Sequence, residues 1–247
     1  MTILVIVESD TPDLSGNAPV YAPVLASLGA ESRVVSPYVA PATAGDFEGA
    51  DGVVFTGSGA PFGTGDPEAA PLRAAMALAF EAGLPAFGSC NGMNLAASLL
   101  GGETGPSPNG YEVPLARDLE LTEAGRAHPM MAGRPLRFSA PCIHFHEIRA
   151  LPDGMTVLAG NAHTPVQAVA YEQGGVSFWG TQYHPEFSLS VVARAMERKG
   201  LGAPETWADL HAAESDPAAA ARLGAGAELR PETRVTELRN WVARIAG

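Results

Sequence analysis

Short apolar segments alternate with helix-like patterns along the first hundred residues. Residues 2–7 form an almost continuous apolar run, typical of a central parallel strand that is covered on both faces. The intervening segments have a helical pattern, and Gly29 is a natural stop for the first of them. Strands are predicted at 2–7, 32–35, 52–56 and 84–88, and helices at 18–28, 67–82 and 93–100. This alternation predicts an open, mostly parallel α/β sheet flanked by helices, with right-handed crossovers.

The pattern changes after residue 100. Residues 101–110 are rich in Gly and Pro and are expected to form a loop. Short strand-like pieces follow at 111–114, 119–122, 136–138, 143–150, 157–159, 166–172 and 176–182. The last two are separated only by Gln173-Gly174-Gly175, which predicts a hairpin. This half is therefore expected to add antiparallel strands to the sheet.

The C-terminal part reads as helical. A helix is predicted at 187–198, and the remaining chain shows helical patterns at 206–213, 216–223 and 231–245. We expect a catalytic domain over 1–200 and a helical extension over 201–247 that packs on it. The last helix carries an apolar stripe at Val235, Leu238, Trp241, Val242 and Ile245. That stripe is expected to pack on the domain; a homodimer or partner surface is the alternative.

Composition narrows the choice of partners and compartment. The 247 residues carry a formal net charge of −12, which argues against nucleic acid or an anionic membrane as a partner. No apolar run is long enough to cross a bilayer, and the N-terminus enters a strand without a basic leader. Two cysteines, Cys90 and Cys142, do not form a disulfide framework, so a cytoplasmic location is expected.

The clearest chemical signal is Gly-x-Cys-x-Gly around Cys90. It stands between the strand at 84–88 and the helix at 93–100, as in a nucleophile elbow. Small neighbours are needed because the turn is tight and its backbone is strained. The turn presents the sulfur beside the first amides of the next helix, which favour a thiolate and a developing oxyanion. A buried cysteine in an ordinary Gly-rich turn is the alternative.

A second segment supplies a candidate base. Residues 178–187 contain His184-Pro185-Glu186. A cysteine nucleophile needs a base, and the base needs a group that orients it. In an extended segment, side chains two residues apart point the same way, so His184 and Glu186 are expected to face one site. A loop that merely caps the following helix is the alternative.

Together these motifs resemble those of the class I glutamine amidotransferases. The resemblance covers residues 1–190 and includes the elbow cysteine, Gly-x-Gln-x-His-Pro-Glu about ninety residues later, and the strand with its Gly-rich loop at 52–61. It implies a flavodoxin-like fold of the class I amidotransferase type. It also implies that Cys90 is the nucleophile, His184 the base and Glu186 the orienting acid. The amide of Asn91 and one amide of the Gly57–Ser58 turn would form the oxyanion hole.

Two departures from the family pattern bear on the substrate. Asn94 stands where the family usually has a glutamine that helps to hold the substrate. Segment 143–148 keeps His144 but has Phe145 and His146 where the family often has Gly and Asp. Asn94, His144, His146 and Gln182 are taken as substrate-binding candidates. A metal held by the paired histidines is a weaker alternative, because no further ligand spacing completes a site.

Two carboxylates end the first strand, Glu8 and Asp10. The carboxyl ends of strands in open α/β sheets are where ligands bind. These groups are expected to cap the following helix, with substrate contact as the alternative.

The predicted function is cysteine-dependent hydrolysis of the γ-amide of glutamine through a γ-glutamyl thioester on Cys90, without a cofactor or a metal. An amidotransferase of this kind would pass ammonia to a separate synthase subunit. One alternative is a stand-alone γ-glutamyl hydrolase acting on a γ-glutamyl amine or peptide. Another, of a different class, is a non-catalytic binding or regulatory module.

Overall fold

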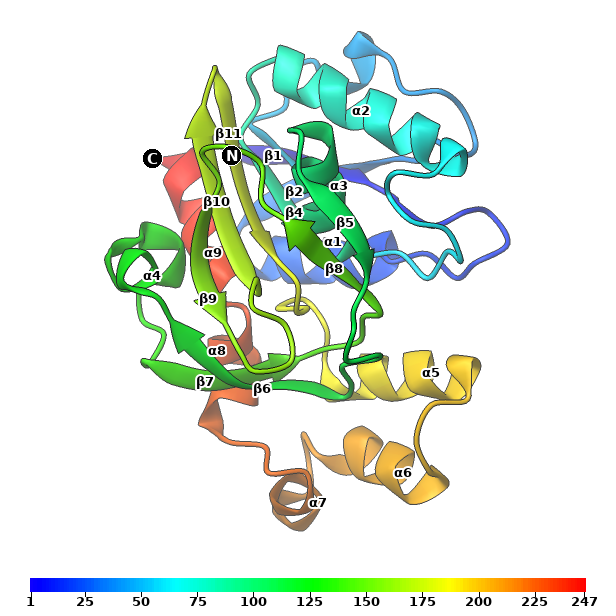
Figure 1. Cartoon of the computed structure of the whole chain (residues 1–247), viewed down its shortest axis with the longest axis vertical. Helices are drawn as coiled ribbons and strands as arrows, with labels where there is room; N and C mark the ends of the chain where they lie inside the picture. The colour runs from blue at the N-terminus through cyan, green and yellow to red at the C-terminus, as the bar shows by residue number, and fades with distance from the viewer.

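A mixed sheet of nine strands forms the centre of the molecule (Figure 1). The structure is a computed structural model that describes residues 1–247. The strands are β1 (Thr2–Val7), β2 (Ala30–Val35), β3 (Gly52–Phe55), β4 (Ala86–Ser89), β5 (Glu103–Pro106), β6 (Leu115–Leu121), β7 (Arg137–Pro141), β8 (His146–Ala150), β9 (Thr156–Gly160), β10 (Ala168–Gln173) and β11 (Val176–Thr181). Their order in the large sheet is β2-β1-β3-β4-β11-β10-β9-β6-β7, and β5 pairs with β8 separately.

The sheet has a parallel half and an antiparallel half. Strands β2, β1, β3, β4 and β11 are parallel neighbours, and β10, β9, β6 and β7 continue in antiparallel pairings. The predicted hairpin is confirmed: Gln173 pairs with Val176, and Gly174 and Gly175 have φ of 59° and 83°. Two residues with positive φ suit the tight turns whose twist matches that of the strands. The expected α/β class with added antiparallel strands is confirmed.

Helices cover both faces of the parallel half. They are α1 (Ala18–Ser27), α2 (Ala70–Glu81) and α3 (Asn91–Leu99), with short 3₁₀ turns η1 (Ala44–Phe47) and η2 (Pro67–Ala69). Alternate side chains of β1 enter different cores, because successive strand residues point to opposite faces. Ile6 joins the cluster that contains Tyr21 of α1, and Val7 joins the cluster that contains Met76 of α2.

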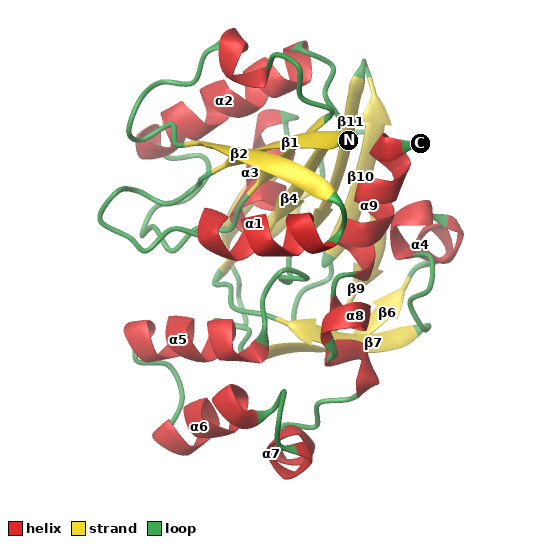
Figure 2. Ribbon diagram, turned by 180° about the vertical axis from the view of Figure 1, so that it is seen from behind, coloured by secondary structure: helices red, strands yellow, loops and turns green.

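The C-terminal region packs in two places (Figure 2). Helix α5 (Leu189–Lys199) ends at Gly200, whose φ is 64°, and packs with α6 (Pro204–Ala212) and α7 (Pro217–Arg222). Helix α9 (Thr236–Ala246) lies on the same face of the sheet as α1, and Leu238 and Trp241 are buried there. The stripe on the last helix therefore packs on the domain, as expected. The division at residue 200 stays a prediction.

The remaining short elements pack near the antiparallel half of the sheet and helix α9. They are α4 (Glu123–Ala127), η3 (Pro129–Met131), η4 (Ala227–Leu229) and α8 (Pro231–Arg234). Arg134, which follows η3, is held by Glu237 of α9 through two hydrogen bonds of 2.7 Å, with side-chain exposures of 1% and 0%. This ion pair ties the last helix to the antiparallel half.

Four local predictions are wrong. The expected loop at 101–110 contains β5, because its backbone pairs with β8. The expected strand at 111–114 is reduced to a single bridge between Glu112 and His144, and the strand predicted from residue 143 begins at His146. The helix expected over 231–245 is interrupted at Val235, which separates α8 from α9.

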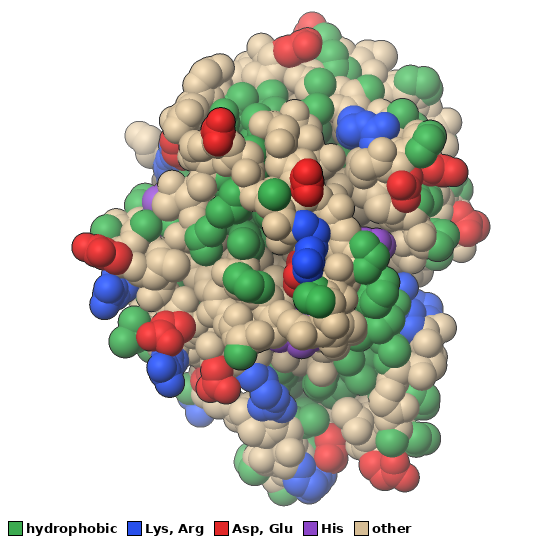
Figure 3. Space-filling view, viewed as in Figure 1, with side chains coloured by type: hydrophobic (Ala, Val, Ile, Leu, Met, Phe, Trp, Pro, Cys, Tyr) green, Lys and Arg blue, Asp and Glu red, His purple; other side chains and the backbone are tan.

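The surface carries both signs of charge. On the face shown in Figure 3, acidic and basic side chains are interspersed among hydrophobic ones. No helix has the length and apolarity needed to cross a membrane.

Candidate active site

Cys90 occupies a sharp turn between β4 and α3. Its φ of 50° and ψ of −104° lie in a backbone region that residues other than glycine rarely adopt. The flanking glycines are required by packing. A Cβ at Gly88 would lie 2.6 Å from the backbone carbon of Gly92, and one at Gly92 would lie 2.4 Å from the Phe55 carbonyl oxygen. The predicted sharp turn between strand and helix is confirmed, and its two glycines are explained by close backbone approach.

His184 and Glu186 form a buried pair after β11. The His184 Nδ1 to Glu186 Oε1 distance is 2.7 Å, with side-chain exposures of 4% and 0%. The segment is a turn and not extended as predicted, because the Phe187 amide donates to the His184 carbonyl. The turn still brings the two side chains together. Ser89 donates to Glu186 Oε2 at 3.0 Å, and Tyr21 in turn hydrogen-bonds Ser89.

The His184 ring is electrostatically tuned. Burial alone would lower its pKa, but the Glu186 carboxylate and the neighbouring Cys90 outweigh burial and raise the pKa to about 10. Phe187 stacks on the ring, with centroids 4.0 Å apart and planes 6° apart. The ring is thus fixed in position and favoured in its protonated form.

Gly57 lies against both Cys90 and His184. A Cβ at Gly57 would be 2.7 Å from His184 Cε1 and 3.7 Å from Cys90 Cβ. The Gly57 carbonyl accepts from Asn17 Nδ2 at 3.0 Å and from the Thr56 hydroxyl at 2.9 Å. Because the peptide is trans, these bonds orient the next N–H to the opposite side.

The two backbone amides proposed for an oxyanion hole have no hydrogen-bond acceptor within the chain. The N–H groups of Ser58 and Asn91 donate to no other group of the protein. Asn91 opens helix α3, where the first N–H groups have no intrahelical acceptor. Both donors are thus available beside the elbow.

The two carboxylates after β1 support neighbouring segments. Glu8 Oε2 accepts from the amides of Asn17 and Ala18 at 2.7 and 2.6 Å, so it caps α1 as expected. Asp10 Oδ1 accepts from the Ser58 hydroxyl at 3.0 Å and from the Gly59 amide at 2.7 Å. Asp10 therefore holds the loop after β3. Burial, the largest influence, raises its pKa.

Two of the four substrate-binding candidates retain unpaired polar atoms. Asn94 is 2% exposed; its Nδ2 donates to the His146 carbonyl at 3.4 Å, and its Oδ1 has no partner. Gln182 is fully buried, and neither its Oε1 nor its Nε2 has a partner. Buried polar atoms without partners cost roughly 1–3 kcal/mol each.

The other two candidates, His144 and His146, have different surroundings. The His144 ring is buried, with Nε2 2.9 Å from Glu112 Oε2 and Nδ1 3.1 Å from the His146 carbonyl. His146 is half-buried and its ring contacts Phe145. Burial, as the largest cause, lowers the pKa of His146. The His144 ring is thus engaged by the chain through both nitrogens, whereas His146 contributes its backbone carbonyl.

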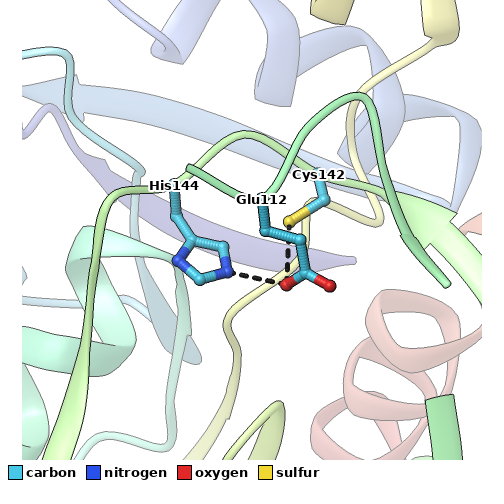
Figure 4. A group of neighbouring side chains, drawn as sticks. All are labelled: Glu112, Cys142 and His144. Carbon is cyan, nitrogen blue, oxygen red and sulfur yellow. Dashed lines mark hydrogen bonds and ion pairs between the residues drawn. The ribbon is translucent and has the colours of Figure 1, made fainter. Parts of the chain in front are cut away.

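A different group of potential metal ligands comes together, namely Glu112, Cys142 and His144 (Figure 4). Their ligand atoms lie within 4.8 Å of one another. Such a donor set suits zinc chemically. Here Glu112 Oε2 also accepts from Gln167 Nε2 at 2.6 Å, so the carboxylate is engaged by the chain's own donors. His146 is not part of the group, so the paired-histidine alternative is not what the fold assembles.

A cleft opens beside His184 between the loop after β1 and helix α5. Its volume is about 870 Å³. One wall is formed by residues of the two loops that follow β1 and β3, and the other by the cleft-facing side of α5. His184, Ile143 and Phe187 contribute to the lining. The site thus continues from the His184 ring into a space much larger than an ammonia molecule.

Sequence reasoning missed several supporting residues. Ser89 holds Glu186, Tyr21 holds Ser89, and Glu112 holds His144, and each partner comes from a distant segment. The one available signal was the position of Ser89 next to the elbow cysteine. The partnership of Glu112 with His144 has no local sequence signal.

Comparison with known proteins identifies the family. The family model "Glutamine amidotransferase class-I" matches residues 20–201. The chain belongs to the class I glutamine amidotransferase family.

Two kinds of curated relative match this chain. A gamma-glutamyl-L-1-hydroxyisopropylamide hydrolase from a Pseudomonas species is 34% identical over 195 residues, which span 75% of this chain and 64% of the relative. A glutamine-hydrolyzing GMP synthase from Thermomicrobium roseum is 34% identical over 154 residues, which span 61% of this chain and 27% of that protein. The chain therefore spans less than two thirds of either relative.

Solved structures agree on the fold. A glutamine amidotransferase from Thermotoga maritima has a TM-score of 0.70 at 17% identity, covering 99% of this chain and 97% of the other. A putative GMP synthase component from Thermoplasma acidophilum has a TM-score of 0.69 at 20% identity, covering 100% and 94%. At these identities the likeness concerns the fold alone.

Proposed function

We propose that this protein hydrolyses the γ-amide bond of glutamine or of a larger γ-glutamyl amide through a thioester on Cys90. The observation that carries the proposal is the convergence at Gly57. The elbow cysteine and the His184 ring, which is bonded to Glu186 at 2.7 Å, both lie against this one residue. A nucleophile, a base and an orienting acid in this arrangement perform acyl transfer.

In the first half-reaction, His184 holds the proton from the Cys90 thiol, and the thiolate attacks the γ-carbonyl carbon. The raised pKa of His184 favours this thiolate–imidazolium pair. The amides of Ser58 and Asn91, with the Gly57–Ser58 peptide held by Asn17, stabilise the tetrahedral oxyanion. His184 then gives its proton to the leaving nitrogen, and the C–N bond breaks.

In the second half-reaction, water hydrolyses the thioester. His184 takes a proton from the water, hydroxide adds to the thioester carbonyl, and the carbon–sulfur bond breaks to release glutamate. Glu186 keeps the ring oriented throughout, supported by Ser89. No cofactor or metal takes part in the proposed steps.

The γ-glutamyl part is proposed to bind on the α3 side of Cys90. The free Oδ1 of Asn94 and the unpaired amide atoms of Gln182 are buried polar groups that a substrate or an ordered water would satisfy. His146 presents a half-buried ring next to Asn94. His144 acts by shaping this segment through Glu112.

The second cysteine is a poor candidate for the same chemistry. Cys142 also has a histidine and a glutamate nearby, but burial, with the Glu112 charge, raises the pKa of its thiol well above the usual value. A thiol with a raised pKa carries little of the reactive thiolate. It provides the matched control for Cys90.

Two biological settings fit this chemistry. In one, the ammonia passes to a separate synthase subunit, as the likeness to GMP synthases suggests. In the other, the chain acts alone on a γ-glutamyl amine, which the hydrolase relative and the cleft of about 870 Å³ favour. The two free thiols suit a cytoplasmic location in either setting, and association into a homodimer would be compatible with both.

The test is glutamate release by the full chain from glutamine and from γ-glutamyl alkylamides. We expect turnover by the native protein and by Cys142→Ala, and loss of about 10³-fold or more in Cys90→Ala. A trapped γ-glutamyl adduct on Cys90 should appear by mass spectrometry. Turnover that persists in Cys90→Ala would contradict the proposal.

A further inference from the structure

Three cations line one wall of the cleft beside His184. They are Arg194 and Arg198 on α5 and Lys199 at its end. Lys199 is the only lysine in a chain whose net charge is −12. None of the three forms an ion pair with an acidic side chain, whereas six of the twelve other arginines do. Unpaired cations concentrated at a cleft of an acidic protein indicate an anionic ligand.

The two arginines lie on the side of α5 that begins next to His184. Phe187, stacked on His184, begins a row of cleft residues that continues through Val191 to Arg194 and Arg198. At about 1.5 Å per residue, Arg194 and Arg198 lie roughly 4.5 and 10.5 Å beyond Val191 along the axis.

Side chains on a helix also lean toward its N-terminus, which is the His184 end of α5. The Arg194 guanidinium shows this, because its Nη1 donates to Ser190 Oγ at 3.1 Å. Lys199 Nζ lies 3.4 Å from the Gly59 carbonyl, so it reaches across to the loop after β3. The cations therefore border the space directly beyond His184.

Two acidic side chains, Asp10 and Asp13, line the opposite wall of the cleft. Asp10 accepts hydrogen bonds from Ser58, Gly59 and Asn17. Asp13 is exposed on the loop after β1. Neutral donors do not cancel the charge of Asp10, so the cleft is lined, apart from His184, by three cations and two carboxylates, a formal balance of one positive charge.

We propose that this cleft binds the amine half of a γ-glutamyl amide whose amine carries an anionic group, a carboxylate or a phosphate. The inference rests on the proposed function, since His184 protonates the leaving nitrogen and the amine must depart on its side. Arg194 and Arg198 bind the anion, and Val191 and Phe187 contact the methylene chain. The Cys90 thiolate forms the carbon–sulfur bond, the C–N bond breaks, and the amine leaves with the proton from His184.

The experiment compares γ-glutamyl amides of equal chain length in the full-length protein. The amine carries a terminal methyl, carboxylate, phosphate or ammonium group, and kcat/KM is measured at low and high salt. We expect the carboxylate or the phosphate to exceed the methyl compound by about tenfold, which corresponds to about 1.4 kcal/mol. The ammonium compound should be the poorest, and the preference should fall with salt. The carboxylate and phosphate arms distinguish the two anions.

Variants of Arg194 and Arg198 test whether helix α5 causes the preference for anionic substrates. Arg194→Gln/Arg198→Gln should bring the ratio of anionic to methyl substrate close to one, and Arg194→Lys/Arg198→Lys should keep most of it. Arg126→Gln is the matched control, because Arg126 is exposed on α4, away from the cleft. The ratio within one protein sample is unaffected by partial misfolding.

Each outcome separates the two proposals. Equal rates on the methyl and anionic compounds, or a preference that survives the double glutamine variant, overturn the anion subsite while leaving γ-glutamyl hydrolysis intact. Absence of Cys90-dependent hydrolysis of every amide and of glutamine overturns the proposed function and the subsite with it.

Discussion

Substituting Gly57 by alanine tests the geometry of the site most directly. The new Cβ would lie 2.7 Å from His184 Cε1, whereas carbon atoms in contact are about 3.5–4.0 Å apart. The ring would have to move by roughly 1 Å. It has little freedom to do so, because Phe187 stacks on it at 4.0 Å and Glu186 holds Nδ1 at 2.7 Å. A misplacement of about 1 Å costs about 10²-fold in rate, so we expect that loss in kcat for Gly57→Ala.

The matched control lies two residues away. A Cβ at Gly59 would have Asp10 Oδ1 and Leu14 Cδ1 at 3.8 Å, which are ordinary contacts. Gly59→Ala should therefore keep activity within about threefold of the native protein, a change below 1 kcal/mol. Steady-state glutamate release and thermal unfolding are measured for both variants. If Gly57→Ala retains native kcat, or if Gly59→Ala is equally impaired, the steric reasoning is wrong.

Three further predictions follow from buried groups. Glu186→Gln removes the charge that raises the pKa of His184, so this pKa should fall toward 6.5. The alkaline limb of kcat plotted against pH should then move to lower pH, and the rate should fall by about 10²–10⁴-fold. An unmoved alkaline limb would contradict this role of Glu186. Arg134→Met removes the counter-charge of the buried Glu237 carboxylate and leaves the Tyr183 hydroxyl as its remaining side-chain donor. We expect a loss of about 3–5 kcal/mol, or about 6–20 °C in Tm by calorimetry; native stability would refute this. Cys142 should react with iodoacetamide only after unfolding, because burial raises its pKa; mass mapping of native labelling at Cys142 would show otherwise.

Local signals in the sequence determined the α/β class and the residues proposed for catalysis. Apolar runs such as β1 and helical periods are short-range patterns, so they identified the parallel strands and their crossovers. The elbow at Cys90 was readable because close backbone approach requires the glycines on either side of it. His184 and Glu186 were readable because their spacing is local, although the turn that joins them was taken for an extended segment.

The tertiary structure decided what depends on distant segments. Glu112 engages His144, Ser89 holds Glu186, and Gly57 meets His184, each across a long stretch of chain. The register that brings such groups together is set by strand pairing and core packing, which one segment does not encode. The same holds for the cleft, because its cations on α5 face a loop that follows β1. The sequence by itself determined which groups are proposed to react; the fold determined which groups hold them, and how large the cleft beside them is.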